Sequence, residues 1–93
     1  MDKNQLQVLK AFYEHADEDF CYRYSWIEDY TGLTRKAAEQ AVRPLRLLGY
    51  IEYVNGLFDE EGKTAGSGFA MSYGRRENIK DLLTSEGIDF NDV

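Results

Sequence analysis

Apolar residues recur at three- and four-residue spacing near the start of the chain, which predicts an amphipathic helix there. The repeat consists of Leu6, Leu9, Phe12, Tyr13 and Ala16. Asp2 and Gln5 have capping-box spacing, at which each side chain accepts a hydrogen bond from the other residue's free backbone amide at a helix start. We therefore expect a first helix that begins after Asp2 and ends near Ala16.

The stretch from Ser25 to Asn55 predicts a short helix, a tight turn, a longer helix and a strand. Ser25 and Glu28 have capping-box spacing at the start of the short helix. Gly32 tolerates a positive φ, and Thr34 can cap the longer helix, so two positions encode the turn. This order of elements predicts a helix-turn-helix.

The longer helix, residues 34–48, separates into two faces when successive residues are placed about 100° apart. The predicted core face consists of Ala38, Ala41, Val42, Leu45 and Leu48. The predicted solvent face consists of Arg35, Lys36, Glu39, Arg43 and Arg46. Pro44 lacks an amide donor, so we expect a kink or a displaced last turn, and Gly49 should end the helix.

Further elements are predicted on both sides of this unit. Residues 20–24 are aromatic and too short for a helix, which indicates a brief strand. Residues 50–58 and 67–73 have apolar side chains at alternating positions and a turn near Gly62 between them, so they predict a hairpin. Residues 75–86 predict a fourth helix whose apolar stripe consists of Ile79, Leu82 and Leu83.

Length and composition favour one folded domain. The chain has 93 residues, of which 43% are hydrophobic and 14% aromatic, enough for one small core. We predict a single domain over residues 1–88 and an acidic tail over residues 89–93. No secretory leader and no apolar run of about 18 residues is visible, which predicts a cytoplasmic protein without a membrane segment.

Residues suited to catalysis or metal binding are few. Cys21 is the only cysteine and His15 the only histidine, which excludes an intramolecular disulfide and leaves too few ligands for a structural zinc site. No phosphate-binding glycine loop or nucleophile elbow is present. The sequence therefore predicts neither an enzyme nor a cofactor.

Charge is distributed unevenly. The net charge of −6 argues against indiscriminate binding of nucleic acid, because phosphates repel an acidic protein. Residues 1–33 have three Lys or Arg against seven Asp or Glu, residues 34–55 have four against two, and residues 56–93 have four against eight. Only the longer helix and the strand after it are net positive.

The order helix, short strand, helix, helix, hairpin resembles the winged helix-turn-helix family over roughly residues 4–75. The likeness is strongest at Trp26-Ile27, residues 30–34, Ala37-Ala38, Val42, Leu45 and residues 48–52. Such runs are frequent in small bacterial and phage regulators, including the MarR-like and PadR-like groups, although the long dimerisation helices of MarR-like proteins are missing. The resemblance implies an α+β, mainly α fold with a three-helix core, a short strand, a β-hairpin wing and a C-terminal helix. It also implies a transcriptional regulator.

The resemblance further implies that the helix 34–48 enters the major groove of double-stranded DNA. The side chains expected to meet DNA are Thr34, Arg35, Lys36, Glu39, Gln40, Arg43 and Arg46. Candidates for phosphate contacts are Ser25, Lys63, Arg75 and Arg76. Because a single DNA-binding module buries only about 600–1,000 Å², we also expect a homodimer, formed through the fourth or the first helix.

The tip of the predicted wing departs from the family pattern. DNA-binding members commonly present arginine or lysine there, whereas residues 58–64 contain three carboxylates and one lysine. Phosphates repel carboxylates, so this tip favours a second hypothesis, a winged-helix module that binds a protein partner through its acidic wing and does not contact DNA. A charged solvent face is common on helices, but these cations lie on the face that the family uses, in the only net-positive segment and beside a turn with the family's spacing.

Overall fold

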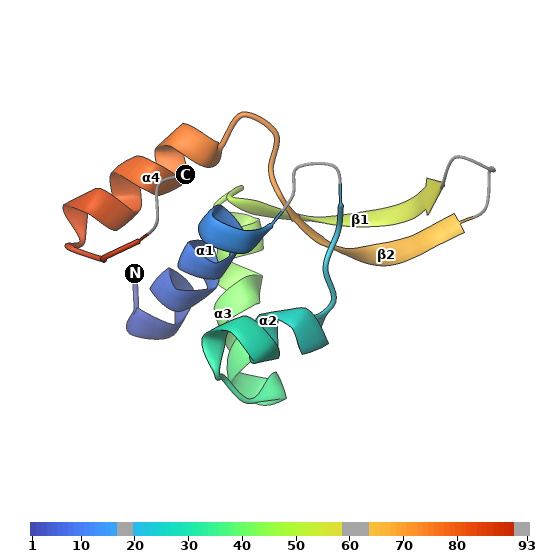
Figure 1. The fold of residues 1–93 in the computed structure, drawn as a ribbon, viewed down its shortest axis with the longest axis horizontal. Coiled ribbons are helices and arrows are strands. Elements are labelled where there is room, and N and C mark those ends of the chain that lie inside the picture. The colour runs from blue at the N-terminus through green and yellow to red at the C-terminus, as the bar shows by residue number, and fades with distance from the viewer. Residues whose placement is uncertain (17–19, 59–63, 91–93) are drawn as a thin grey trace.

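The structure, a computed structural model, describes residues 1–16, 20–58 and 64–90. Within these residues the chain forms four helices, α1 Lys3–His15, α2 Tyr24–Thr31, α3 Arg35–Leu47 and α4 Arg76–Ser85, and two strands, β1 Ile51–Phe58 and β2 Thr64–Met71. Figure 1 shows α1, α2 and α3 packed together, α4 beside α1, and the antiparallel hairpin extending away from the helices. The predicted α+β, mainly helical fold is confirmed.

Helix α1 lies at the centre of the core and contacts α2, α3, α4 and β2. Its start has the predicted capping box: the amide of Gln5 donates to Oδ1 of Asp2 at 2.8 Å, and the amide of Asp2 donates to Oε1 of Gln5 at 3.2 Å. The helix ends at His15, with Ala16 at the C-cap. The core around it consists of Leu6, Val8, Leu9, Phe12, Tyr13, Ile27, Ala38, Ala41, Val42, Leu45, Ile51, Phe69, Ile79 and Leu83.

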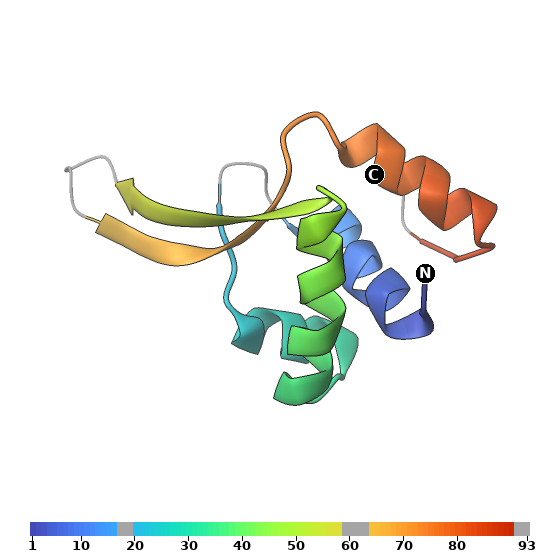
Figure 2. The ribbon, with the colours of Figure 1, turned by 180° about the vertical axis from the view of Figure 1, so that it is seen from behind.

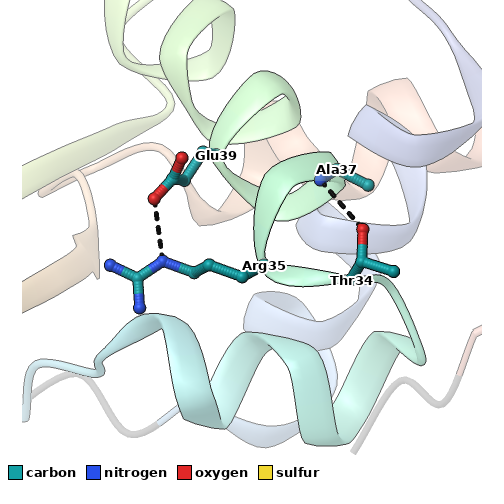
Figure 3. Close-up of polar contacts among 4 residues, drawn as sticks. All are labelled: Thr34, Arg35, Ala37 and Glu39. Atoms are coloured by element: carbon teal, nitrogen blue, oxygen red, sulfur yellow. Dashed lines mark hydrogen bonds and ion pairs between the residues drawn. The ribbon is translucent and has the colours of Figure 1, made fainter.

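The turn between α2 and α3 has the predicted chemistry. Gly32 adopts a φ of +74°, a conformation that suits glycine. The hydroxyl of Thr34 accepts a hydrogen bond from the amide of Ala37 at 3.2 Å and so caps α3 (Figure 3). This turn fixes the angle at which α3 leaves α2.

The start of α2 differs from the prediction. The helix begins at Tyr24, and Arg23 occupies the N-cap position without a side-chain hydrogen bond, so the capping box predicted at Ser25 is wrong. Tyr22 just upstream exchanges two backbone hydrogen bonds with Phe69, at 2.8 and 2.7 Å. The helix starts as soon as this pairing ends. The brief strand predicted here is reduced to this single bridge.

The core face of α3 is predicted correctly except at its end. Ala38, Ala41, Val42 and Leu45 are buried, but Leu48 is 55% exposed. Gly49, at a φ of +83°, reverses the chain, and the amide of Tyr50 donates to the carbonyl of Leu45. The helical repeat therefore stops before Leu48 can turn inward. Helix α3 is otherwise continuous through Pro44.

The hairpin has two chemically different faces. Ile51 pairs with Met71 and Tyr53 with Phe69, and this face packs on the helices through the buried Ile51 and Phe69. The opposite face presents Val54 and other alternate residues. The hairpin tip predicted near Gly62 lies outside the described residues.

Helix α4 closes the core from the side of α1. Ile79 and Leu83 are buried, as predicted, and Gly87 caps the helix while the amide of Ile88 donates to the carbonyl of Leu83 at 2.9 Å. Beyond the predicted domain boundary, Phe90 packs edge-on against the ring of Tyr13, with 5.1 Å between centroids. The packed body therefore reaches past residue 88 into the predicted tail.

Candidate nucleic-acid interface

The polar side chains predicted on the solvent face of α3 are all exposed. Arg35 and Glu39 are paired there, with 2.9 Å between Nε of Arg35 and Oε1 of Glu39 (Figure 3). Lys36 and Gln40, each one residue farther along the helix than a member of this pair, are also exposed. The cap of Thr34 holds the first turn of this face in place.

Arg35 also contacts the ring of Tyr24 in the first turn of α2. Its guanidinium carbon lies 4.2 Å from the ring centroid, within the range of a cation–π interaction. Burial raises the pKa of the Tyr24 hydroxyl, and the nearby carboxylate of Glu39 raises it further, while Arg35 and two other arginines of α3 oppose the rise. Tyr24 is therefore a neutral support for Arg35 at neutral pH.

Arg46 connects α3 to the hairpin. Its guanidinium carbon lies 5.7 Å from the ring centroids of both Tyr53 and Phe69. The hydroxyl of Tyr53 donates to Oγ of Ser67 across the hairpin at 2.8 Å. Arg46 is thus directed toward the helix-facing side of the hairpin and away from the end of α3.

Two hollows border this part of the molecule, and Tyr53 lines both. One, of about 340 Å³, lies between α2, α3 and β2 and is lined by Arg23, Ser25 and Arg35 among others. The other, of about 530 Å³, lies at the base of the hairpin and includes Arg43 and Arg46. We call the four arginines along these hollows, Arg23, Arg35, Arg43 and Arg46, the basic surface.

Figure 2 shows the elements around which the four arginines lie. The amino-terminal end of α3 lies beside α2, and its carboxyl-terminal end leads into the hairpin, which extends to one side. Between them, Arg23 reaches toward β2: a methyl group on Gly66 would lie 3.4 Å from Nη2 of Arg23. Cations from α3 and from the segment before α2 therefore line two hollows that share Tyr53.

The predicted phosphate-contact residues are spread more widely. Ser25 is exposed in the first turn of α2 and belongs to the smaller hollow. Arg75 lies over the ring of Tyr50 at 5.6 Å, near the end of α3, whereas Arg76 lies over the ring of Tyr13 at 4.2 Å and is directed toward α1. Lys63 lies outside the described residues. Arg76 is therefore separate from the basic surface.

Sequence reasoning missed two members of this site. Arg23 precedes α2 and is brought to β2 by the bridge between Tyr22 and Phe69, a contact between segments far apart in the chain. Tyr53 was expected among the alternating apolar residues of its strand, but its 48% exposure and its contact with Arg46 make it part of the surface. The alternation in β1, which places Tyr53 on the same face as Ile51, was the one sequence pattern that indicated that Tyr53 faces α3.

Comparison of the chain with protein-family models, with curated proteins and with solved structures gave no significant match. Over the described residues, no helix has the length and hydrophobicity to cross a bilayer. The same residues contain no group of three or more side chains arranged to hold a metal ion.

Proposed function

We propose that this protein is a winged-helix DNA-binding protein that recognises duplex DNA through α3 and regulates transcription. The observation that supports this most is the basic surface: four arginines from α3 and the segment before α2 are exposed along two hollows that share Tyr53. The chain as a whole is acidic, with a net charge of −6. A local concentration of cations in an acidic protein directs an anionic partner to that face.

The exposed face of α3 suits the major groove. Its amino-terminal half presents Arg35, Lys36 and Gln40, side chains that bind guanine, phosphate and adenine edges. Arg43 and Arg46 lie farther along the helix, toward the hairpin, where they would meet the DNA backbone. In this proposal the hairpin is the wing, and Arg46 sets its position relative to α3 through Tyr53.

The acidic tip of the predicted wing would repel phosphates, but Arg23 provides a cation elsewhere beside the hairpin. Its guanidinium lies beside β2 near Gly66, on the side of the basic surface. A phosphate held by Arg23 needs no cation from the tip residues. Binding of DNA beside the hairpin, without contact to its tip, is therefore compatible with the charges.

A second copy of the chain completes the proposal, because one module buries too little surface for tight specific binding. The apolar stripe of α4 is already buried against its own core through Ile79 and Leu83. Leu47 is 83% exposed and Leu48 55% exposed at the end of α3. We propose that homodimers form through these two leucines.

The exposed leucines also favour a second candidate function, docking of a different protein on the end of α3. In that case the basic surface would be dispensable for complex formation. Replacement of Leu47 and Leu48 by serine would abolish the complex, and Arg43→Ala would leave it intact. The homodimer predicts instead that the serine variant lowers the oligomer mass and weakens DNA binding.

The experiment that tests DNA binding is selection of bound duplexes from a random library, followed by titration of the selected sequence at several salt concentrations. We expect affinity to fall steeply with salt. Arg35→Ala and Arg43→Ala should each weaken specific binding by about 1–3 kcal/mol. Lys3→Ala, an exposed cation at the start of α1, is the matched control and should have little effect.

The result that would overturn the proposal is equally direct. No binding to the pool of random duplexes at low salt would exclude DNA as the partner. Equal losses for Lys3→Ala and Arg43→Ala would mean that charge in general, and not the basic surface, attracts the duplex.

A further inference from the structure

A third hollow, of about 470 Å³, lies on the face of the hairpin opposite α3. It is bordered by the segment before α2, by both strands and by the first turn of α4, through residues such as Phe20, Cys21, Val54, Ala70 and Tyr73. Val54 and Ala70 alternate with Tyr53 and Phe69, which face the helices, so the hollow is separated from the basic surface by the hairpin. Its volume is in the range of small-molecule sites, about 300–1,000 Å³.

The lining of this hollow combines apolar surface with exposed aromatic rings. Phe20 is 61% exposed, and Tyr73 is fully exposed. Aromatic rings that no described residue covers offer their faces to a ligand that enters from solvent. Such rings bind flat apolar groups and also attract cations.

The charged side chains of the lining determine whether it attracts a cationic or an anionic ligand. Glu52 and Glu77 are exposed, and neither takes part in an ion pair with another described residue. Arg76 is the one cation among the lining residues that the structure describes, and its guanidinium lies over the ring of Tyr13, 4.2 Å from the centroid. Over these described residues, two carboxylates and one arginine make the lining net negative.

We propose that this hollow binds a lipophilic organic cation, an aromatic group that bears one quaternary or protonated nitrogen. The aromatic part would lie against Phe20 and Tyr73, and the cationic nitrogen would lie near Glu52 and Glu77. Because the hollow includes residues of both strands and of the first turn of α4, the bound cation holds the hairpin against α4. Control of DNA affinity by the cation depends on the proposed function, whereas binding of the cation does not.

The test uses three probes that share one naphthalene ring: naphthylmethyl-trimethylammonium, naphthalenemethanol and naphthylacetate. Each is titrated into the full-length protein by calorimetry and by NMR. We expect the ammonium to bind about tenfold more tightly than the carboxylate, because two carboxylates attract it. The double variant Glu52→Gln with Glu77→Gln should lose about that factor for the ammonium while its circular dichroism stays unchanged.

Matched controls distinguish this inference from the proposed function. Asp81→Asn, an exposed carboxylate of α4 outside the lining, should leave ammonium binding unchanged, and so should Arg43→Ala on the basic surface. Equal or tighter binding of naphthylacetate, or ammonium binding that survives both Gln substitutions, would overturn the inference. Duplex binding without ammonium binding would refute this inference alone, and ammonium binding without duplex binding would refute only the proposed function.

Discussion

Arg35 and Glu39 are hydrogen-bonded to each other across one turn of α3, with 2.9 Å between Nε and Oε1. Their side chains are 59% and 47% exposed, and pairs of this kind stabilise a fold by only about 0.2–1 kcal/mol. The larger effect of Glu39 is on charge, because its carboxylate neutralises one of the cations on the basic surface. A phosphate or base that binds Arg35 therefore competes with the Glu39 carboxylate for the charge of the guanidinium.

Glu39→Gln should therefore strengthen duplex binding. Removal of the carboxylate frees Arg35 and lowers repulsion of phosphates, so we expect an affinity gain of several-fold at low salt and a steeper salt dependence, by about one released counterion. Fluorescence anisotropy with a labelled duplex at several salt concentrations measures both. Glu86→Gln, at the far end of α4, is the control, and an equal gain there would show that net charge alone is responsible.

Gly68→Ala should weaken the fold by distorting the contact between the segment before α2 and the hairpin. A Cβ atom at Gly68 would lie 2.6 Å from the carbonyl oxygen of Tyr22 and 2.8 Å from its carbonyl carbon, so one backbone has to move. We expect a loss of about 1–3 kcal/mol, typical of overpacking. Urea unfolding measures it. Ser67→Ala at the adjacent position should cost less, and an unchanged midpoint for Gly68→Ala would contradict the close approach.

Leu83→Ala tests whether α4 belongs to the same cooperative unit as the other helices. Leu83 is fully buried against the core, and such a truncation costs about 2–5 kcal/mol. Thr84→Ala, at the adjacent exposed position of α4, is the control and should shift stability by at most about 0.5 kcal/mol. Both are measured by denaturant unfolding followed by circular dichroism. A small loss for Leu83→Ala would mean that α4 is only loosely attached.

Local sequence signals predicted the parts of the fold that depend on neighbouring residues. The capping box of Asp2 and Gln5, the positive φ of Gly32 and the cap of Thr34 are all short-range effects, and each is present. The prediction at Ser25 fails because the bridge between Tyr22 and Phe69 decides where α2 starts. A contact between residues 47 positions apart leaves no local pattern in the sequence.

The candidate site also combines features that local sequence patterns predict with features that depend on long-range contacts. Helical periodicity placed Arg35, Arg43 and Arg46 on the exposed face of α3, and the structure has them there. Arg23 was missed because its place beside β2 depends on the same long-range bridge. Arg76 was grouped with the phosphate-contact residues by its position after the hairpin, but its contact with Tyr13 turns it toward α1. Helical periodicity thus predicted which side chains of α3 are exposed, whereas the positions of Arg23 and Arg76 depend on tertiary structure.

Tyr24 should make stability fall at alkaline pH. Burial raises the pKa of its hydroxyl above the ordinary value, and Glu39 adds to the rise. The unfolded chain releases this proton from about pH 10 upward, while the folded chain retains it. The stabilisation from neutral Tyr24 is therefore fully present below about pH 10 and is lost as the pH rises through the raised pKa of the folded state.

Tyr24→Phe isolates this effect, because it removes one hydroxyl and changes no other titratable side chain. The free energy of unfolding, measured in urea across the alkaline range, should fall less steeply in the variant than in the parent. The difference in near-ultraviolet absorbance between the folded parent and Tyr24→Phe should show that Tyr24 ionises above its ordinary range, and Glu39→Gln should bring its pKa closer to the ordinary value. If the free energy of unfolding falls equally steeply with pH in the parent and in Tyr24→Phe, the hydroxyl of Tyr24 is solvated. Water would then reach the contact between Tyr24 and Arg35.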